Sequence, residues 1–248
     1  MKNDTVNTAS LTPVGDSALL VEFENRIDPE INAQVLRLKQ SIDIAKMPGI
    51  IEVVPSYRSL LIQYNCISTS LEQLSNAVNS LIDKADANAG NARCWRVPVL
   101  YGGEAGCDLD EVARLHDMST QDVIRLHSDA VFRVYMLGFA PGWCYLGGLP
   151  DALHTPRLKS PRLQVPKGCI SIGGQQGMIG AMAMPSGWRL LGQTPVRSYD
   201  PKRQPPFIIE AGDEVRFYAV DSSEFQRLEQ AAEKGGALIE AVQIGARQ

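Results

Sequence analysis

The spacing of hydrophobic residues in the first hundred positions switches between the period of a strand and the period of a helix. Leu19, Val21 and Phe23 alternate with polar neighbours, which predicts a strand. A helical apolar stripe follows the capping residue Asp28, and a second follows the capping box Thr69–Glu72. The pattern predicts strands at residues 17–24, 50–54, 58–64 and 93–99, with the two helices between them. This order predicts a ferredoxin-like α/β domain over residues 1–98.

Shorter elements are expected after residue 99. Apolar spacing and capping residues predict helices at 108–115, 119–128 and 221–234. Short apolar runs between turn residues predict strands at 131–139, 169–172, 188–191, 207–209 and 215–220, with a last one at 237–244. Such spacing is typical of a small β-barrel or sandwich over residues 99–248. The chain is therefore expected to be an α+β protein of two domains.

Composition narrows the possible functions. The formal net charge is −4, with 44% hydrophobic and 21% charged residues. These values fit a globular protein and argue against a nucleic-acid partner, which requires a broad basic surface. No apolar run approaches the roughly 18 residues of a membrane helix, and the first residues lack the apolar segment of a signal peptide. Five cysteines without a CxxC pair favour free thiols in the cytoplasm and no metal site.

Residues 138–192 differ from the rest of the chain. Five cationic side chains stand here against one anionic side chain, so this stretch is positive inside a negative protein. Glycine lets the backbone approach a ligand closely, and proline stiffens the turns around it. A rigid, glycine-rich, positive region suits a small anionic ligand.

Several residues in and near this region are candidates for such a site. Arg157 and Arg162 each follow a proline, and a guanidinium suits a carboxylate or phosphate, although both could also be plain surface residues. The same argument applies more weakly to Lys167. The turn at Gly173 and Gly174 could expose N–H groups to an oxyanion, or could be an ordinary hairpin turn. Two further candidates are Gln176, as an amide that orients a ligand, and His127, as a proton carrier or a structural helix-end histidine.

The longer motifs carry a resemblance. The segments GDSALLVEF, GIIEVVPSYRSLLIQY, YGGEAGCDLDEVA, HSDAVFRVYMLGFAPGWCYLGGL, TPRLKSPRLQVPKGCISIGG and GWRLLGQTP together resemble the family of the 5-oxoprolinase B subunit. This family is also called allophanate hydrolase subunit 1 or the sporulation kinase-inhibitor family. The match runs from about Gly15 to Phe217. It implies an N-terminal ferredoxin-like domain and a C-terminal cyclophilin-like β-barrel.

The resemblance also implies an activity and partners. Members combine with the A and C subunits of 5-oxoprolinase to open 5-oxo-L-proline to L-glutamate at the expense of ATP. A histidine-kinase inhibitor and a component related to urea carboxylase are the alternatives. Under the first of these functions, Arg157, Arg162 and Lys167 would hold the substrate carboxylate, and Gly173, Gly174 and Gln176 would face the lactam. His127 and Arg162 would be the catalytic residues.

One departure from the family pattern concerns an expected cation. Members usually read GRTP where this chain has Gly192-Gln193-Thr194-Pro195. The resemblance therefore implies a weaker anion site at position 193.

Overall fold

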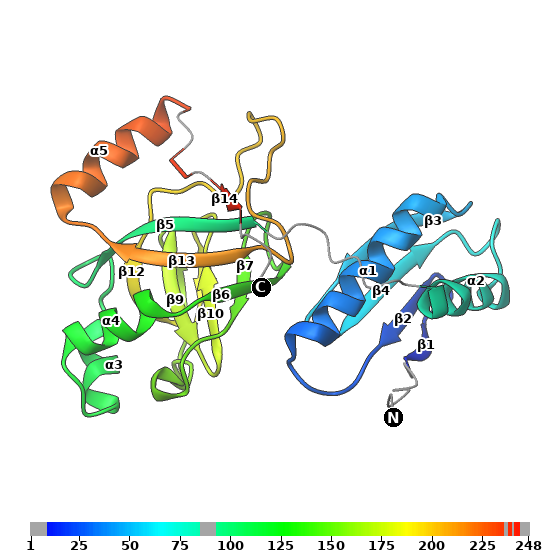
Figure 1. Cartoon of the computed structure of the whole chain (residues 1–248), viewed down its shortest axis with the longest axis horizontal. Coiled ribbons are helices and arrows are strands. Elements are labelled where there is room, and N and C mark those ends of the chain that lie inside the picture. Colours follow the sequence, from blue (N-terminus) through cyan, green and yellow to red (C-terminus); the bar gives the residue numbers. More distant parts are fainter. Residues whose placement is uncertain (1–8, 85–92, 236–237, 240, 244–248) are drawn as a thin grey trace. The chain divides into compact units, whose positions relative to one another are not determined.

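The computed structural model describes residues 9–84, 93–235, 238–239 and 241–243. The chain divides into two compact units, Met1–Gly90 and Asn91–Gln248, which Figure 1 shows with their elements labelled. This division lies eight positions before the predicted boundary at residue 98. The strand at residues 93–99 belongs to the second unit, because its hydrogen bonds are made there.

The first unit is an antiparallel sheet with two helices on one face (Figure 1). Its strand order is β1-β2-β4-β3. The elements are β1 (Ser10–Val14), β2 (Ala18–Glu22), α1 (Pro29–Ala45), β3 (Ile50–Pro55), β4 (Ser59–Tyr64) and α2 (Leu71–Lys84). The predicted ferredoxin-like order needs correction at one strand: β1, which the pattern did not predict, lies beside β2 where the strand at 93–99 was expected.

Local chemistry fixes both helix starts. Asp28 accepts hydrogen bonds from the N–H groups of Glu30 and Ile31 through Oδ1, and Pro29 occupies the first turn of α1. The capping box of α2 lies one residue later than predicted, between Ser70 and Gln73. The predicted cap, Thr69, instead donates its hydroxyl to the Pro48 carbonyl, 2.8 Å away. This bond ties the start of α2 to the turn after α1.

The second unit contains a closed barrel of seven strands. Their order is β12-β9-β10-β7-β6-β13-β5, and β5 pairs with β12 to close the ring. The strands are β5 (Arg93–Tyr101), β6 (Phe132–Leu137), β7 (Cys144–Gly147), β9 (Cys169–Gly173), β10 (Gln176–Ile179), β12 (Arg189–Gln193) and β13 (Glu214–Ala219). The predicted α+β class with a C-terminal barrel is confirmed. The β5–β13 pair is parallel, and the other pairs of the ring are antiparallel.

Smaller elements surround the barrel. They are α3 (Leu109–Leu115), α4 (Thr120–Asp129), the 3-10 turn η1 (Asp151–Leu153), β8 (Arg162–Val165), β11 (Met184–Ser186), α5 (Ser222–Glu233) and β14 (Ala241–Gln243). Helices α3 and α4 lie side by side, and α5 contacts β5 (Figure 1). The predicted strand at 207–209 is wrong, because only Phe207 forms an isolated bridge, with Tyr199. The predicted strand at 237–244 is described only as β14, and part of its range lies outside the described residues.

Candidate functional site

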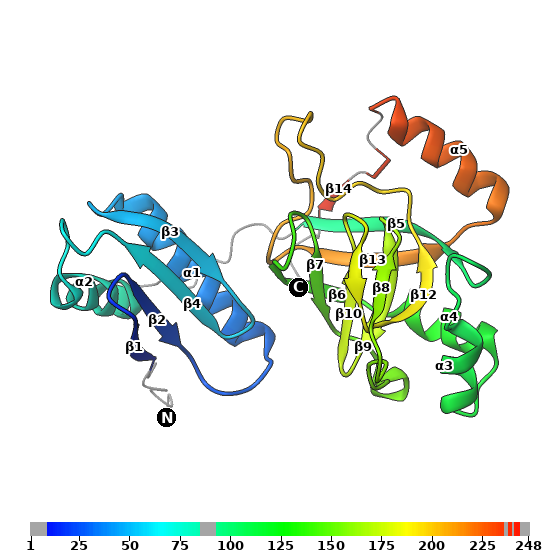
Figure 2. The same ribbon diagram turned by 180° about the vertical axis from the view of Figure 1, so that it is seen from behind.

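The wall of the barrel separates two apolar clusters. Strand β9 alternates, so Ile170 and Ile172 point into the barrel core while Cys169 faces outward. The outer cluster consists of Trp143, Val165, Cys169, Met178, Trp188 and Leu190. The two-stranded sheet of β8 and β11 contributes Val165 to this outer cluster. Figure 2 shows strands β9, β10 and β12 of this wall from the near side.

On the outer wall, the Trp188 ring contacts both Arg157 and Tyr145. The Arg157 guanidinium carbon lies 4.9 Å from the centre of the Trp188 ring, a cation–π contact. Tyr145 meets the same indole edge-on, with ring centres 5.9 Å apart. Arg157 is exposed and has no carboxylate partner within salt-bridge distance among the described residues. The stacking therefore holds a free positive charge in a fixed place.

Gly173 makes this arrangement possible. A Cβ at this position would lie 2.8 Å from Trp188 Cδ2 and 3.2 Å from Arg157 Cγ, so a larger residue would push both side chains away. Gln176 is the cross-strand neighbour of Gly173 in the β9–β10 hairpin, and opposite residues face the same side of a sheet. Arg157, Gly173 and Gln176 therefore lie together with Trp188 and Tyr145. We call these five residues the Trp188 face.

The predicted oxyanion turn is an ordinary hairpin turn. Gly174 has a φ of 62°, which suits the turn between β9 and β10. Its N–H group donates to the Thr155 carbonyl at 2.7 Å, and its carbonyl accepts from the Thr155 N–H. The Gly174 N–H is thus already used within the fold. The expectation that it receives a ligand oxygen is corrected.

Arg162 forms an ion pair with a buried carboxylate. Its Nη2 donates to Asp108 Oδ1 at 2.6 Å, and the other oxygen of Asp108 accepts from the Leu190 N–H at 2.7 Å. Asp108 is buried, with its side chain 5% exposed. This contact raises the pKa of Arg162 above its ordinary value. Nη1 of Arg162 is buried without a hydrogen-bond partner in the described structure, so the catalytic role of Arg162 stays a prediction.

His127 is buried in the second unit and is not a surface proton carrier. Its ring stacks on Phe217 at 4.7 Å between centres, and its Nδ1 forms a 2.7 Å hydrogen bond with the Tyr101 hydroxyl. Its Nε2 has no hydrogen-bond partner in the described structure. Burial lowers the pKa of His127 from 6.5 to about 3. The predicted catalytic role is corrected: the imidazole is fully buried and stays neutral near pH 7.

This depressed pKa predicts an acid-sensitive fold. Between pH 6.5 and about 3 the unfolded chain binds a proton at His127 that the folded chain does not. Stability is therefore expected to fall as the pH is lowered through this window, by up to about 1.4 kcal/mol per pH unit. Urea unfolding at several pH values measures the slope. Tyr101→Phe alone should keep this contribution and the double variant Tyr101→Phe, His127→Phe should lose it; equal slopes would contradict the assignment.

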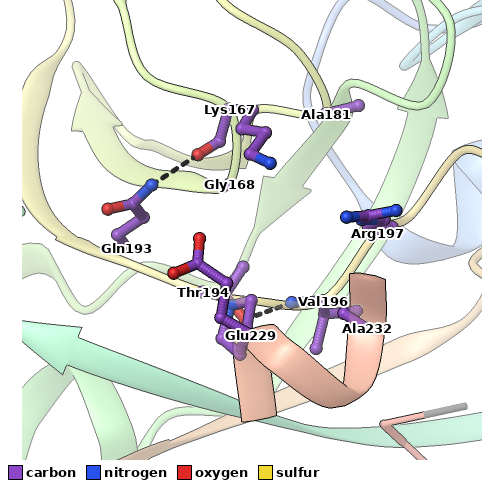
Figure 3. Close-up of a pocket in the computed structure, with 10 residues that line it drawn as sticks. Lys167, Gly168, Ala181, Gln193, Thr194, Val196, Arg197, Glu229 and Ala232 are labelled. Atoms are coloured by element: carbon purple, nitrogen blue, oxygen red, sulfur yellow. Dashed lines mark hydrogen bonds between the residues drawn. The ribbon is translucent and has the colours of Figure 1, made fainter. Parts of the chain in front are cut away.

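Lys167 lies at the other end of β9 from Gly173. Lys167 lies in the turn before β9, and the strand from Cys169 to Gly173 spans roughly 13 Å at about 3.3 Å per residue. A small ligand cannot touch both ends, so the structure does not bring Lys167 together with Arg157. Lys167 lines a separate pocket instead, which Figure 3 shows with Gln193, Arg197 and Glu229. Gln193 donates through Nε2 to the Lys167 carbonyl at 2.8 Å.

Four residues of these two surfaces were not assigned a binding role from the sequence. Trp188 and Tyr145 are typical of a wall or a core, and only the position of Arg157 above the indole distinguishes them from other core aromatic residues. Arg197 and Glu229 come from the loop after β12 and from α5, and no local motif marks either residue.

Neither a metal cluster nor a membrane span is present in the part of the chain that the structure describes. No group of three or more histidine, cysteine or acidic side chains within it is placed to hold a metal ion. None of its helices has the length and apolar character of a membrane span.

Comparison with known proteins identifies relatives over most of the chain. Residues 9–209 match the model of the carboxyltransferase domain, subdomain C and D. The chain is 35% identical to the B subunit of 5-oxoprolinase from Bacillus subtilis, over 86% of this chain and 93% of that protein. It is 36% identical to the B subunit of 5-oxoprolinase from Escherichia coli O157:H7, over 82% of this chain and 93% of that protein.

Solved structures agree with these matches. TTHA0988 is 34% identical with a TM-score of 0.74, and the match covers 83% of this chain but only 40% of that longer chain. The urea carboxylase of Kluyveromyces lactis has the same fold, with a TM-score of 0.79 at 20% identity, over 95% of this chain and 24% of that one. This chain therefore belongs to the carboxyltransferase subdomain C and D family, together with the proteins named as B subunits of 5-oxoprolinase.

Proposed function

We propose that this chain is a subunit of an ATP-dependent 5-oxoprolinase, a complex that opens 5-oxo-L-proline to L-glutamate. The observation that carries the proposal is its likeness to the 5-oxoprolinase B subunits along nearly the whole length of those relatives. Homologues of the A and C subunits are the partners that this function requires.

The Trp188 face supplies groups that suit this substrate. 5-Oxoproline has one carboxylate and one lactam ring. The unpaired guanidinium of Arg157 can bind the carboxylate through two parallel hydrogen bonds. Gln176, on the same side of the wall, offers an amide that can donate to the lactam oxygen or accept from the lactam N–H. Arg157 is exposed, so a partner surface has to cover the substrate and exclude water.

The glycine-rich turn after β9 does not fit an ATP site. Phosphate binding typically uses free N–H groups of a glycine-rich loop at the start of a helix. The glycine-rich turn after β9 leads into strand β10, and its Gly174 N–H already donates to Thr155. The ATP of the proposed reaction is bound by the complex, and the Gly174 N–H is not available to its phosphates.

A carboxyl-transfer role is the second candidate. It is favoured by the match to a carboxyltransferase domain model. Urea amidolyase of Lachancea kluyveri is 24% identical, but the match covers only 14% of that protein. The kinase-inhibitor alternative has no support from the described residues and stays a prediction.

Reconstitution tests the proposed function. The chain is combined with homologues of the A and C subunits, and glutamate is measured after adding 5-oxo-L-proline and ATP. Glutamate is expected only when all three proteins and ATP are present. Equal glutamate production without this chain would contradict the proposal. ATP hydrolysis that depends on urea or bicarbonate instead of 5-oxoproline would favour carboxyl transfer.

Gly173→Ala offers a test of the Trp188 face within that complex. The added methyl group would collide with Trp188 and displace Arg157, so kcat/KM for 5-oxoproline is expected to fall roughly 10-fold. Gly187→Ala is the matched control, because a Cβ there meets its nearest neighbours at 3.5 Å and needs no movement. A Gly173→Ala complex as active as the Gly187→Ala complex would remove the face from the substrate site.

A further inference from the structure

The pocket beside Lys167 is separate from the Trp188 face and has its own chemistry. It is an open surface pocket, lined by residues of the turn before β9, the segment after β10, the end of β12 with the loop that follows it, and helix α5. Figure 3 shows Lys167, Arg197 and Glu229 on different sides of this space. We call it the rim pocket.

The charged groups of the rim pocket are not paired with one another. Lys167, Arg197 and Glu229 all line the pocket, yet none of them has an ion-pair partner within 4.0 Å among the described residues. Arg197 and Glu229 are half-buried, so both lose part of their hydration without gaining a counter-charge. Two cations and one carboxylate are thus presented to a ligand.

The backbone that carries these groups is fixed before any ligand arrives. The Gly168 N–H donates to the Gly180 carbonyl at 2.6 Å, and the Thr194 N–H donates to the Gly168 carbonyl at 2.8 Å. Gly168 has a φ of 74°, and a Cβ there would collide with the Thr194 carbonyl oxygen. The side-chain amide of Gln193 donates a hydrogen bond to the Lys167 carbonyl and so connects the end of β12 to the turn before β9. Such preorganisation lowers the entropic cost of binding.

We infer that the rim pocket binds a small α-amino dicarboxylate. Such a molecule has two carboxylates and one ammonium, the reverse of the charges of Lys167, Arg197 and Glu229. A simple monocarboxylate such as 5-oxoproline would leave Glu229 without a counter-charge. The proposal rests on the proposed function only in the choice of probe, since L-glutamate is the product of that reaction and has these three groups.

Calorimetric titration of the full chain alone tests the inference. L-Glutamate is expected to bind with a Kd of about 1 mM or below, and glutarate, which lacks the ammonium, at least about 10-fold more weakly. Glu229→Gln should abolish the preference for glutamate over glutarate. Arg197→Gln should weaken both ligands by roughly 10-fold. Glu233→Gln, at an exposed position of the same helix, should change neither value.

Three results would overturn the inference: no glutamate binding to the folded chain at about 10 mM, equal affinity for glutamate and glutarate, or inorganic phosphate bound as tightly as glutamate.

The test is independent of the proposed function. Binding of glutamate depends on the rim pocket variants, whereas the 5-oxoprolinase reaction depends on Arg157 and on the partner proteins. Either can therefore fail without the other.

Discussion

Replacing Arg157 with alanine is expected to lower kcat/KM of the reconstituted complex for 5-oxo-L-proline by roughly 100-fold. The variant removes the one cation of the Trp188 face that has no carboxylate partner among the described residues. The substrate carboxylate would then be covered by the partner surface without a counter-charge, which is costly. Steady-state assays of glutamate formation measure the effect.

Two matched variants separate this role from a general loss of charge. Lys159→Ala removes an exposed cation two positions away in the same loop and is expected to leave kcat/KM unchanged. Arg157→Lys keeps the charge but loses the planar fork that stacks on Trp188, so an intermediate value is expected. If Lys159→Ala were as damaging as Arg157→Ala, a general positive field and not the Arg157 position would be responsible.

Asp108→Ala is expected to lower the free energy of unfolding by about 3–5 kcal/mol, because it removes one partner of a buried ion pair. The variant leaves the Arg162 guanidinium without its 2.6 Å partner and the Leu190 N–H without its 2.7 Å acceptor. The Asp108 side chain is buried, and the Arg162 side chain is only partly exposed, so neither group is fully hydrated when its partner is lost. Urea unfolding followed by circular dichroism measures the change.

The controls for Asp108 use nearby positions. Asp110→Ala, at an exposed position of α3, is expected to change stability by less than about 0.5 kcal/mol. Arg162→Ala should destabilise the fold while leaving KM for 5-oxoproline unchanged in the folded fraction. A large rise in KM with normal stability would instead support the catalytic role that the sequence indicates for Arg162.

The local pattern predicted most helices and strands of the first unit, because their apolar spacing and caps lie within a few residues. The local pattern did not predict which strands pair when the two strands are far apart in the sequence. Strand β5 looks like a neighbour of the preceding elements, yet it lies parallel to β13, which follows more than a hundred residues later. The residues of β5 alone do not indicate that β13 is its partner. β8 was missed because it is short, two of its four residues are exposed, and it has no apolar period.

The candidate site was only partly predictable for a related reason. Arg157 and Lys167 are close in sequence, but Lys167 lies just before the start of β9 while Arg157 lies beside Gly173 at the end of that strand. The proline before Arg162 indicates a stiff turn, but it cannot show that Asp108 lies beneath it. His127 lies at the polar end of a helix in the sequence, and only the packed aromatic rings reveal its burial.

The most direct test of the central claim compares 5-oxo-L-proline with its carboxamide, which has the same ring but no negative charge. In the wild-type complex the acid is expected to be preferred by roughly 100-fold in kcat/KM, and in the Arg157→Ala complex the preference should nearly vanish. That result would place the substrate carboxylate at Arg157. An undiminished preference for the acid in the Arg157→Ala complex would show that the carboxylate is bound elsewhere.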